Sequence, residues 1–190
     1  METDYSIELE DINNTLTNGG VILYPTDTIW GIGCDVFALE AVEKIYKIKK
    51  RPRELPFILL VSDIAMLKRY VNIHPRLETL LVYHEKPLTL IYEEVYDLPE
   101  SVLSEEGTIA IRVTHDPFCQ RVIEQLDSPL VSTSANVSGE SFPNCFDDIT
   151  GDILRHMDYV VEYRREDKEQ RTPSVMAEFN NKGELFFIRE

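Results

Sequence analysis

The sequence contains no long apolar run and only three cysteines. No hydrophobic stretch approaches the roughly 20 residues that a helix needs to cross a bilayer, and the acidic first residues lack the basic and apolar parts of a signal peptide. Cys34, Cys119 and Cys145 show no C-x-x-C spacing, so they indicate neither a disulfide framework nor a zinc site. We therefore expect a cytoplasmic protein with reduced thiols and no membrane contact.

Positive charge is also scarce, because 34 Asp and Glu residues outnumber 19 Lys and Arg residues and give a net charge of −15. Affinity for nucleic acids depends largely on Lys and Arg side chains that neutralise phosphates. General nucleic-acid binding is therefore disfavoured, although a local basic patch could hold a small anion. The histidines are scattered without the spacing of a zinc site, and no nucleophile elbow supports a Ser-His-Asp hydrolase.

What the sequence does contain is a regular alternation of helix-like and strand-like segments. Apolar residues at helical spacing predict helices over residues 7–16, 38–49 and 62–71 and after Asp116-Pro117. Compact apolar runs predict strands over residues 21–24, 57–61, 88–92, 108–113, 130–131, 174–179 and 185–188. This alternation over 190 residues is typical of a single α/β domain, residues 1–190, whose sheet is covered by helices.

Two polar segments follow predicted strands, where ligands bind in open α/β sheets. Residues 25–33, PTDTIWGIG, combine threonines, a carboxylate and glycines, which would let the backbone approach a ligand while hydroxyl groups orient it. The alternative is an ordinary turn in which Asp27 and the threonines cap local amides. Residues 132–139, STSANVSG, gather hydroxyl and amide groups that either bind a polar ligand or form a simple turn.

A third segment concentrates positive charge in this acidic chain. Six cations lie close together, namely Lys44, Lys47, Lys49, Lys50, Arg51 and Arg53. The helix dipole favours positive charge at the end of a helix, so a solvated helix end is one interpretation. Clustered like charges repel one another, and a bound triphosphate would relieve that repulsion. We therefore favour the alternative that a triphosphate binds here, with the Arg guanidinium donating paired hydrogen bonds to phosphate oxygens. The mixed charges of residues 162–171 predict a solvated loop.

Together these segments resemble the motifs of the YrdC family, the threonylcarbamoyl-AMP synthases. The similarity is carried, in family order, by residues 24–33 (YPTDTIWGIG), 45–52 (IYKIKKRP), 108–113 (TIAIRV), 132–139 (STSANVSG), 173–175 (PSV) and 188–190 (IRE). Each motif alone is modest, but together they span residues 21–190 and are highly specific. The resemblance implies a YrdC/RibB-like α/β fold, with a twisted mixed sheet flanked by helices and a large concave cleft.

The resemblance also implies a reaction. L-threonine, bicarbonate and ATP would give threonylcarbamoyl-AMP and pyrophosphate with the help of Mg²⁺, which makes the enzyme a nucleotidyltransferase. A separate tRNA threonylcarbamoyl transferase would use the product for the N6-threonylcarbamoyladenosine modification at position 37 of tRNA. The family pattern assigns no metal-ligating residue to the protein itself.

Carried over residue by residue, the family pattern predicts two sets of ligand-binding side chains. The ATP-binding set is Lys49, Arg51, Thr108, Ser134, Asn136 and Arg189, with Lys49 and Arg51 at the phosphates as catalytic residues. The L-threonine-binding set is Thr28, Arg112, Ser132 and Ser174, with Arg112 as the partner of the carboxylate. We expect Lys49 and Arg51 to be exposed in the cleft, where the cationic helix end folds against Ser134.

The chain also departs from the family pattern. Leu55 stands where the family usually has Lys or Asn, and residues 84–86, 162–164 and 175–178 differ from the family motifs. These departures leave open a diverged paralogue that acts as a weak RNA-binding module or handles another carbamoyl substrate. The net charge of −15 opposes RNA binding, whereas the cations of residues 44–53 favour it.

Overall fold

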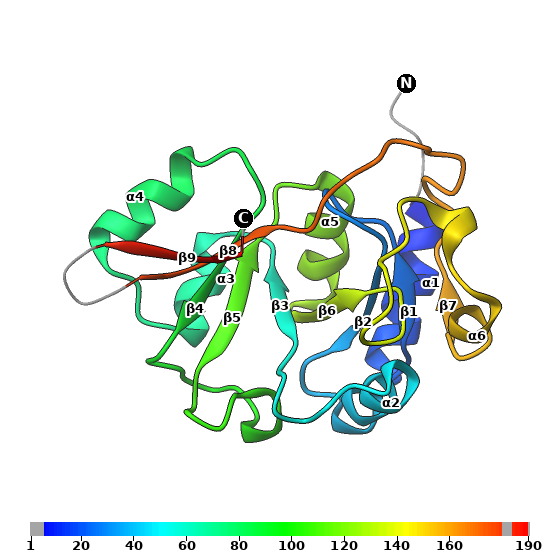
Figure 1. Cartoon of the computed structure of the whole chain (residues 1–190), viewed down its shortest axis with the longest axis horizontal. Coiled ribbons are helices and arrows are strands. Elements are labelled where there is room, and N and C mark those ends of the chain that lie inside the picture. Colours follow the sequence, from blue (N-terminus) through cyan, green and yellow to red (C-terminus); the bar gives the residue numbers. More distant parts are fainter. Residues whose placement is uncertain (1–5, 180–183, 190) are drawn as a thin grey trace.

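The computed structural model describes residues 6–179 and 184–189. In that part of the chain, one mixed sheet contains the strands β1 (Ile22–Tyr24), β2 (Gly31–Asp35), β3 (Ile58–Val61), β4 (Leu88–Tyr92), β5 (Ile109–Val113), β6 (Leu130–Ser134), β7 (Tyr159–Val160), β8 (Val175–Phe179) and β9 (Leu185–Arg189). The flanking helices are α1 (Ser6–Thr17), α2 (Leu39–Lys49), α3 (Ile64–Tyr70), α4 (Pro75–Tyr83), α5 (Pro117–Leu126) and α6 (Gly151–Leu154) (Figure 1). The predicted α/β class is confirmed.

The order of the strands brings distant parts of the chain side by side. Across the sheet the order is β7-β1-β2-β6-β3-β5-β4-β8-β9. The strand β2 pairs with β6 in antiparallel fashion, so that Gly31 lies opposite Ser134 and Gly33 opposite Ser132. The strands β3 and β5 are parallel, and β4 and β8 are parallel as well. The ends of these strands therefore collect residues from the first and last parts of the chain.

Close backbone packing near Tyr24 explains the two glycines of β2. A Cβ atom built on Gly33 would lie 2.6 Å from the carbonyl oxygen of Val131 and 2.8 Å from the Tyr24 ring, so a larger residue would force the strands apart. The Tyr24 hydroxyl donates a hydrogen bond to Ser132 Oγ at 2.7 Å, and burial raises the pKa of Tyr24. The sequence thus places a polar contact beneath the ends of β2 and β6.

Local capping determines where the helices begin and end. The Asp116 carboxylate accepts hydrogen bonds from the N–H groups of Phe118 and Cys119 at 3.0 and 3.1 Å, and Pro117 opens α5 as predicted. The C-terminal end of a different helix, α2, is capped by Lys50, whose backbone is left-handed with φ of 50°. The helix α1 packs against α5 and the sheet, and α2 packs against β2. None of the described helices is long and apolar enough to cross a membrane.

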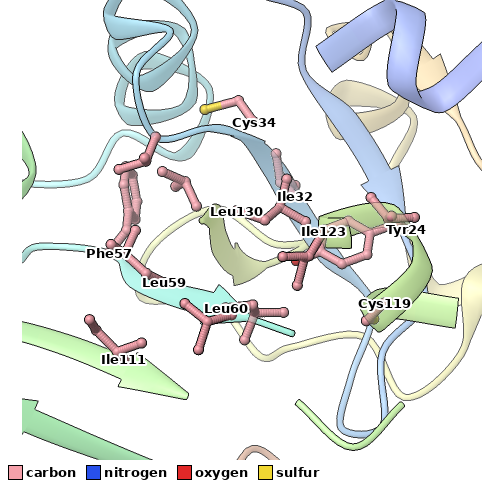
Figure 2. Close-up of a cluster of buried hydrophobic side chains, with 14 of the residues drawn as sticks. Tyr24, Ile32, Cys34, Phe57, Leu59, Leu60, Ile111, Cys119, Ile123 and Leu130 are labelled. Atoms are coloured by element: carbon pink, nitrogen blue, oxygen red, sulfur yellow. The ribbon is translucent and has the colours of Figure 1, made fainter. Parts of the chain in front are cut away.

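The hydrophobic core lies between the sheet and the helices packed on it (Figure 2). Ile32, Leu59 and Ile123 are fully buried there, and the thiols of Cys34 and Cys119 are buried among them. All three cysteines are free, as the sequence predicted. Burial raises the pKa of the Cys34 and Cys119 thiols, so they stay protonated and unreactive at neutral pH.

Several segments differ from the sequence prediction, and the short elements α6 and β7 were not predicted at all. Residues 31–33 belong to β2, a strand that we did not predict, because pairing with β1 and β6 imposes an extended backbone on a glycine-rich segment. Residues 132–134 likewise extend β6 where we expected a polar loop. The helix α4 was missed, although Pro75 at its first position is an ordinary start signal; its cap is His74, a residue that does not usually mark a helix start.

The expectation of a solvated loop over residues 162–171 is confirmed for most of the segment, but Arg164 makes an inward contact that the sequence did not predict. Arg164 in this loop donates a hydrogen bond to the buried Asp116 carboxylate at 2.5 Å. Burial opposes the charge on Arg164, but the bond to Asp116 raises its pKa overall. Arg164 has a φ of 63°, a conformation that glycine adopts without cost, and it stands within a departure from the family motifs. The chain after β7 then crosses the molecule to reach β8 (Figure 1).

Candidate active site

A pocket of about 510 Å³ opens where several strand ends and loops meet. It lies between the β1–β2 loop, the loop after α2, the segment after β6 and the strands β8 and β9. Most of the predicted site residues line it, namely Thr28, Arg51, Arg112, Ser132, Ser134, Asn136, Ser174 and Arg189. The expectation that the cationic end of α2 folds against Ser134 is therefore confirmed.

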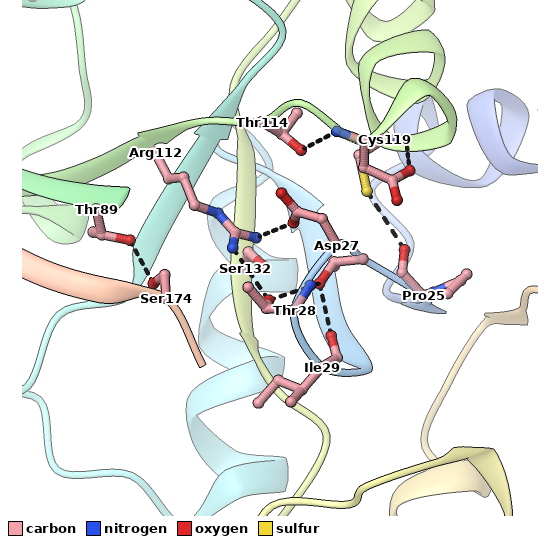
Figure 3. A network of polar contacts seen from close by, with 12 residues as sticks. Pro25, Asp27, Thr28, Ile29, Thr89, Arg112, Thr114, Cys119, Ser132 and Ser174 are labelled. Carbon is pink, nitrogen blue, oxygen red and sulfur yellow. Dashed lines mark hydrogen bonds and ion pairs between the residues drawn. The ribbon is translucent and has the colours of Figure 1, made fainter. Parts of the chain in front are cut away.

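Arg112 on β5 provides a buried positive charge at this pocket (Figure 3). Its side chain is 4% exposed, and its guanidinium lies 3.2 Å from the Asp27 carboxylate and donates to Thr28 Oγ1 at 3.1 Å. The Nε atom of Arg112 is buried without a hydrogen-bond partner in the described structure. Because buried N–H groups are normally paired, this unpartnered donor is an exception in the structure.

The β1–β2 loop holds its hydroxyl groups in a fixed arrangement. Thr26 Oγ1 lies 2.8 Å from Thr28 Oγ1 and also accepts a hydrogen bond from the Thr28 backbone N–H at 2.9 Å. The Thr26 hydroxyl also donates to the carbonyl oxygen of Ile29 at 2.8 Å. The interpretation of these threonines as local caps and their proposed contact with a ligand are therefore compatible, since both side chains line the pocket.

A second guanidinium reaches the pocket from β9. Arg189 donates to the carbonyl oxygen of Ser174 through Nε at 3.2 Å and Nη2 at 2.9 Å. Ser174 Oγ in turn lies 2.8 Å from Thr89 Oγ1 (Figure 3). Burial and the neighbouring charge of Arg112 lower the pKa of Arg189. With Asp27 as the carboxylate paired to Arg112, this side of the pocket carries excess positive charge and suits an anion. Glu190, the last residue of the predicted motif, lies outside the described residues.

Arg51 supplies the cation on the α2 side of the pocket. Its Nε donates to the carbonyl oxygen of Leu55 at 2.8 Å and its Nη2 to that of Pro56 at 3.0 Å. Its guanidinium also lies 5.3 Å from the centre of the Phe57 ring. Burial lowers the pKa of Arg51, although Tyr46 partly counteracts this. These contacts shape the 51–57 loop and aim the arginine at the pocket.

Lys49 is not exposed in the pocket, contrary to our expectation. Its side chain is 1% exposed, and its ammonium donates to the carbonyl oxygens of Ser134 at 2.5 Å and Asn136 at 2.6 Å. These carbonyls belong to the last residue of β6 and to the segment after it, and the lysine side chain turns toward them rather than toward the pocket. Burial and repulsion from Arg51 lower the pKa of Lys49 to about 7.

Other predicted cations and one predicted hydroxyl also lie away from the pocket lining. Lys44 pairs with Asp158 at 2.6 Å, and Arg53 forms an ion pair with Glu43. Thr108 lies just before β5, where its hydroxyl is 2.8 Å from that of Ser104. The positive charge of residues 44–53 is thus partly neutralised within the protein.

The side chains that line the pocket suit a metal ion that is bound to substrate phosphates. Among the described residues, no group of three His, Cys, Asp or Glu side chains could hold a metal. Glu140 contributes a carboxylate to the lining. Mg²⁺ commonly binds one or two carboxylates together with substrate phosphates, so this lining fits an ion that arrives with a polyphosphate.

Sequence reasoning missed the apolar part of the lining and the role of Asp27. The apolar residues include Trp30, Phe57, Phe142 and Met176, of which Phe142 and Met176 carried no sequence signal. Asp27 stands inside the quoted motif of residues 24–33, and its acidic side chain beside a buried strand was the available signal. Its pairing with Arg112 depends on β5, which is distant in the sequence.

Comparison with known proteins gives consistent sequence matches. The model of the Sua5/YciO/YrdC family, described as telomere recombination, matches residues 14–190. A protein of Hydrogenovibrio crunogenus named threonylcarbamoyl-AMP synthase is 36% identical over 130 residues, which cover 66% of this chain and 70% of that protein. A protein of the same name from Xanthomonas euvesicatoria pv. vesicatoria is 35% identical over 139 residues, covering 71% of this chain and 74% of its own length.

Solved structures share the fold. A Sua5 variant from P. abyssi superposes with a TM-score of 0.84 at 21% identity, over 95% of this chain and 52% of that chain. Sua5 from P. abyssi in complex with L-threonine gives a TM-score of 0.79 at 21% identity, over 91% and 51%. YciO from E. coli gives a TM-score of 0.83 at 23% identity, over 97% of this chain and 89% of that chain. The chain therefore spans about half the length of the two Sua5 chains.

Proposed function

The chain belongs to the Sua5/YciO/YrdC family, and from this premise we propose that it is an L-threonylcarbamoyladenylate synthase. As a nucleotidyltransferase it would make threonylcarbamoyl-AMP and pyrophosphate from L-threonine, bicarbonate and ATP. A separate tRNA threonylcarbamoyl transferase would then use the product for the N6-threonylcarbamoyladenosine modification at position 37 of tRNA. Relatives that carry the synthase name and match most of the chain support this assignment over an RNA-binding module.

The observation that supports the proposal most is one pocket lined by arginines from separate elements. Arg51 comes from the loop after α2, whereas Arg112 and Arg189 come from β5 and β9. The proposed substrates carry negative charge at the threonine carboxylate and at the triphosphate. Guanidinium groups recognise both carboxylate and phosphate through paired hydrogen bonds. A pocket of this composition can therefore hold the two substrates at the same time.

The proposed roles follow from the position of each side chain. Arg112 would bind the threonine carboxylate because it brings a guanidinium to the pocket lining, and Thr28, Ser132 and Ser174 would surround the rest of the amino acid. Arg51, Ser134, Asn136 and Arg189 would contact the nucleotide. The roles assigned by resemblance to Thr108 and Lys49 stay predictions, since neither side chain lines the pocket.

The proposed reaction needs positioning and charge stabilisation rather than a protein nucleophile. The threonine amine adds to bicarbonate or its carbon dioxide, with loss of water or a proton, to give a carbamate. A carbamate oxygen then attacks the α-phosphorus of ATP, the bond to the β-phosphate oxygen breaks, and pyrophosphate leaves. Holding the carbamate in line with the α-phosphate and neutralising the departing charge are the contributions expected of the arginines. Mg²⁺ carried by the ATP phosphates would add to this neutralisation.

The proposal is tested by measuring pyrophosphate release from ATP with and without L-threonine and bicarbonate. We expect release only when both are present, together with formation of threonylcarbamoyl-AMP detected by mass spectrometry. Arg51→Ala should reduce kcat/KM by about 100-fold or more, since it removes a donor to charge that develops on the phosphates. Arg121→Ala, an exposed arginine on α5, is the matched control and should leave the rate unchanged.

Release of pyrophosphate that is independent of threonine would contradict the amino-acid substrate. No release under any of these conditions, from a protein with an unchanged melting temperature, would contradict the synthase assignment itself.

A further inference from the structure

Lys49 joins two parts of the pocket wall that are far apart in the sequence. It is the last residue of α2, and its ammonium reaches the carbonyl oxygens of Ser134 at 2.5 Å and Asn136 at 2.6 Å. A longer contact of 3.4 Å leads to Asn136 Oδ1. In the opposite direction, the Ser138 backbone N–H donates to the Lys49 carbonyl oxygen at 2.8 Å. Both the side chain and the backbone of Lys49 thus hold the segment 134–138.

These contacts use the hydrogen-bonding capacity of the ammonium, which has three N–H donors. A phosphate oxygen could bind Lys49 only by displacing carbonyl oxygens, and buried carbonyls that lose their partner cost free energy. The Lys49 side chain is also 1% exposed, and it does not belong to the pocket lining, to which Ser134 and Asn136 do belong. The geometry therefore argues against a direct bond from Lys49 to a ligand.

Ser134 is held in the sheet by its pairing with Gly31, but the residues that follow it have few other attachments. Among the described residues, the further hydrogen bond that joins residues 135–140 to another part of the chain runs from the Ala135 N–H to the carbonyl oxygen of Trp30, at 3.0 Å. The Asn136 side-chain amide donates within the segment, to the carbonyl oxygens of Val137 and Glu140. A loop attached at so few points depends strongly on the contacts of Lys49.

We propose that Lys49 is a positioning residue, whose buried ammonium ties residues 134–138 to the end of α2 and so holds Asn136 in the pocket wall beside the strand residue Ser134. The phosphates of a nucleotide are then met by Arg51, which lines the pocket, and not by Lys49. That the bound molecule is a nucleotide rests on the proposed function. The attachment of residues 134–138 by Lys49 does not depend on it. These separate roles predict that substitutions of Lys49 and of Arg51 affect nucleotide binding in different ways.

The test compares Lys49→Met, Arg51→Ala and the control Lys86→Met, an exposed lysine outside the pocket lining, in calorimetric binding of adenosine, AMP and ATP. Lys49→Met should weaken all three ligands by the same factor, about tenfold, because it removes the support of a wall that every ligand contacts. Arg51→Ala should weaken ATP far more than adenosine. A loss in Lys49→Met that grows with the number of phosphates would overturn the proposal.

Hydrogen exchange tests the tie without any ligand. Amides of residues 134–138 should exchange faster in Lys49→Met than in the wild type and in Lys86→Met, and unchanged exchange would overturn the proposal. If the wild type binds no adenine nucleotide, the proposed function fails while this measurement still decides the role of Lys49.

Wild-type protein provides a readout that holds even if Lys49→Met does not fold. Acetylation with a succinimidyl ester, followed by mass spectrometry, should modify Lys49 much more slowly than Lys86, both with and without ATP. Labelling of Lys49 at the rate of Lys86 in the free protein, with protection by ATP alone, would identify a direct phosphate ligand and overturn the proposal.

Discussion

Buried charge determines the character of the pocket at the scale of single residues. Arg112 is 4% exposed and lies 3.2 Å from the carboxylate of Asp27. A buried guanidinium that loses its counter-charge destabilises the folded state by several kcal/mol. Asp27 therefore stabilises the pocket before any ligand binds, and an anion bound to Arg112 would supply a second negative charge.

We expect Asp27→Asn to lower the free energy of unfolding by roughly 3 kcal/mol, because it leaves the Arg112 charge uncompensated. L-threonine should restore part of this loss, since its carboxylate replaces the missing charge and a ligand stabilises the state that it binds. Urea denaturation with and without L-threonine measures both effects. Asp152→Asn, which breaks an exposed pair with Arg155, is the control and should change stability by less than about 0.5 kcal/mol. Equal stability of Asp27→Asn and the wild type would refute the argument.

Single-residue predictions from sequence succeeded where the motif and the backbone position together aim the side chain. Arg51 and Arg112 line the pocket as expected. Lys49 does not, because a long flexible side chain turns toward whichever acceptors lie nearby, and these acceptors belong to residues 134–136, which are distant in the sequence. No sequence pattern around Lys49 could reveal that the carbonyl oxygens of Ser134 and Asn136 lie within reach of its ammonium.

At the scale of elements, some helix starts were predicted well because their signals are local, whereas α4 and α6 were missed. The pair Asp116-Pro117 predicted α5 from its cap and its first residue, and both are in place. The strand β2, with the sequence GIGCD, was missed because glycine weakens a strand and gives no apolar alternation. Its extended form comes from β1 and β6 on either side, which only the assembled sheet provides.

Asp116 joins two elements, since it caps α5 and pairs with Arg164 of the distant 162–171 loop. Asp116→Ala should lower the free energy of unfolding by about 3 kcal/mol, because it removes the cap and leaves Arg164 without its partner. Asp116→Asn keeps a capping oxygen and should cost less. Urea denaturation of the two variants separates the contributions. Equal losses in both would show that the amide cannot replace the capping carboxylate, and no loss in Asp116→Ala would contradict the structural role of the pair.

At the scale of the whole molecule, the distribution of charge argues against a surface for nucleic acids. The net charge is −15, and in the described part of the chain only part of the positive charge of residues 44–53 is exposed and unpaired, at Lys47 and Lys50. Lys44 pairs with Asp158, Arg53 pairs with Glu43, and Lys49 is buried. Folding thus divides the six cations of this segment: two form ion pairs, Lys49 is buried, Arg51 lines the pocket, and Lys47 and Lys50 stay on the surface.

We therefore expect duplex RNA to bind no more tightly than a Kd of about 10⁻⁴ M near physiological salt, the weak end of non-specific binding. Few phosphates would be neutralised, so the affinity should also change little with salt concentration. Fluorescence anisotropy of a labelled RNA hairpin at several salt concentrations measures both quantities, with ATP binding to the same preparation as the control for an intact pocket. Micromolar affinity that falls steeply with salt concentration would show that a basic surface is available to RNA. That result would favour the RNA-binding module over the synthase.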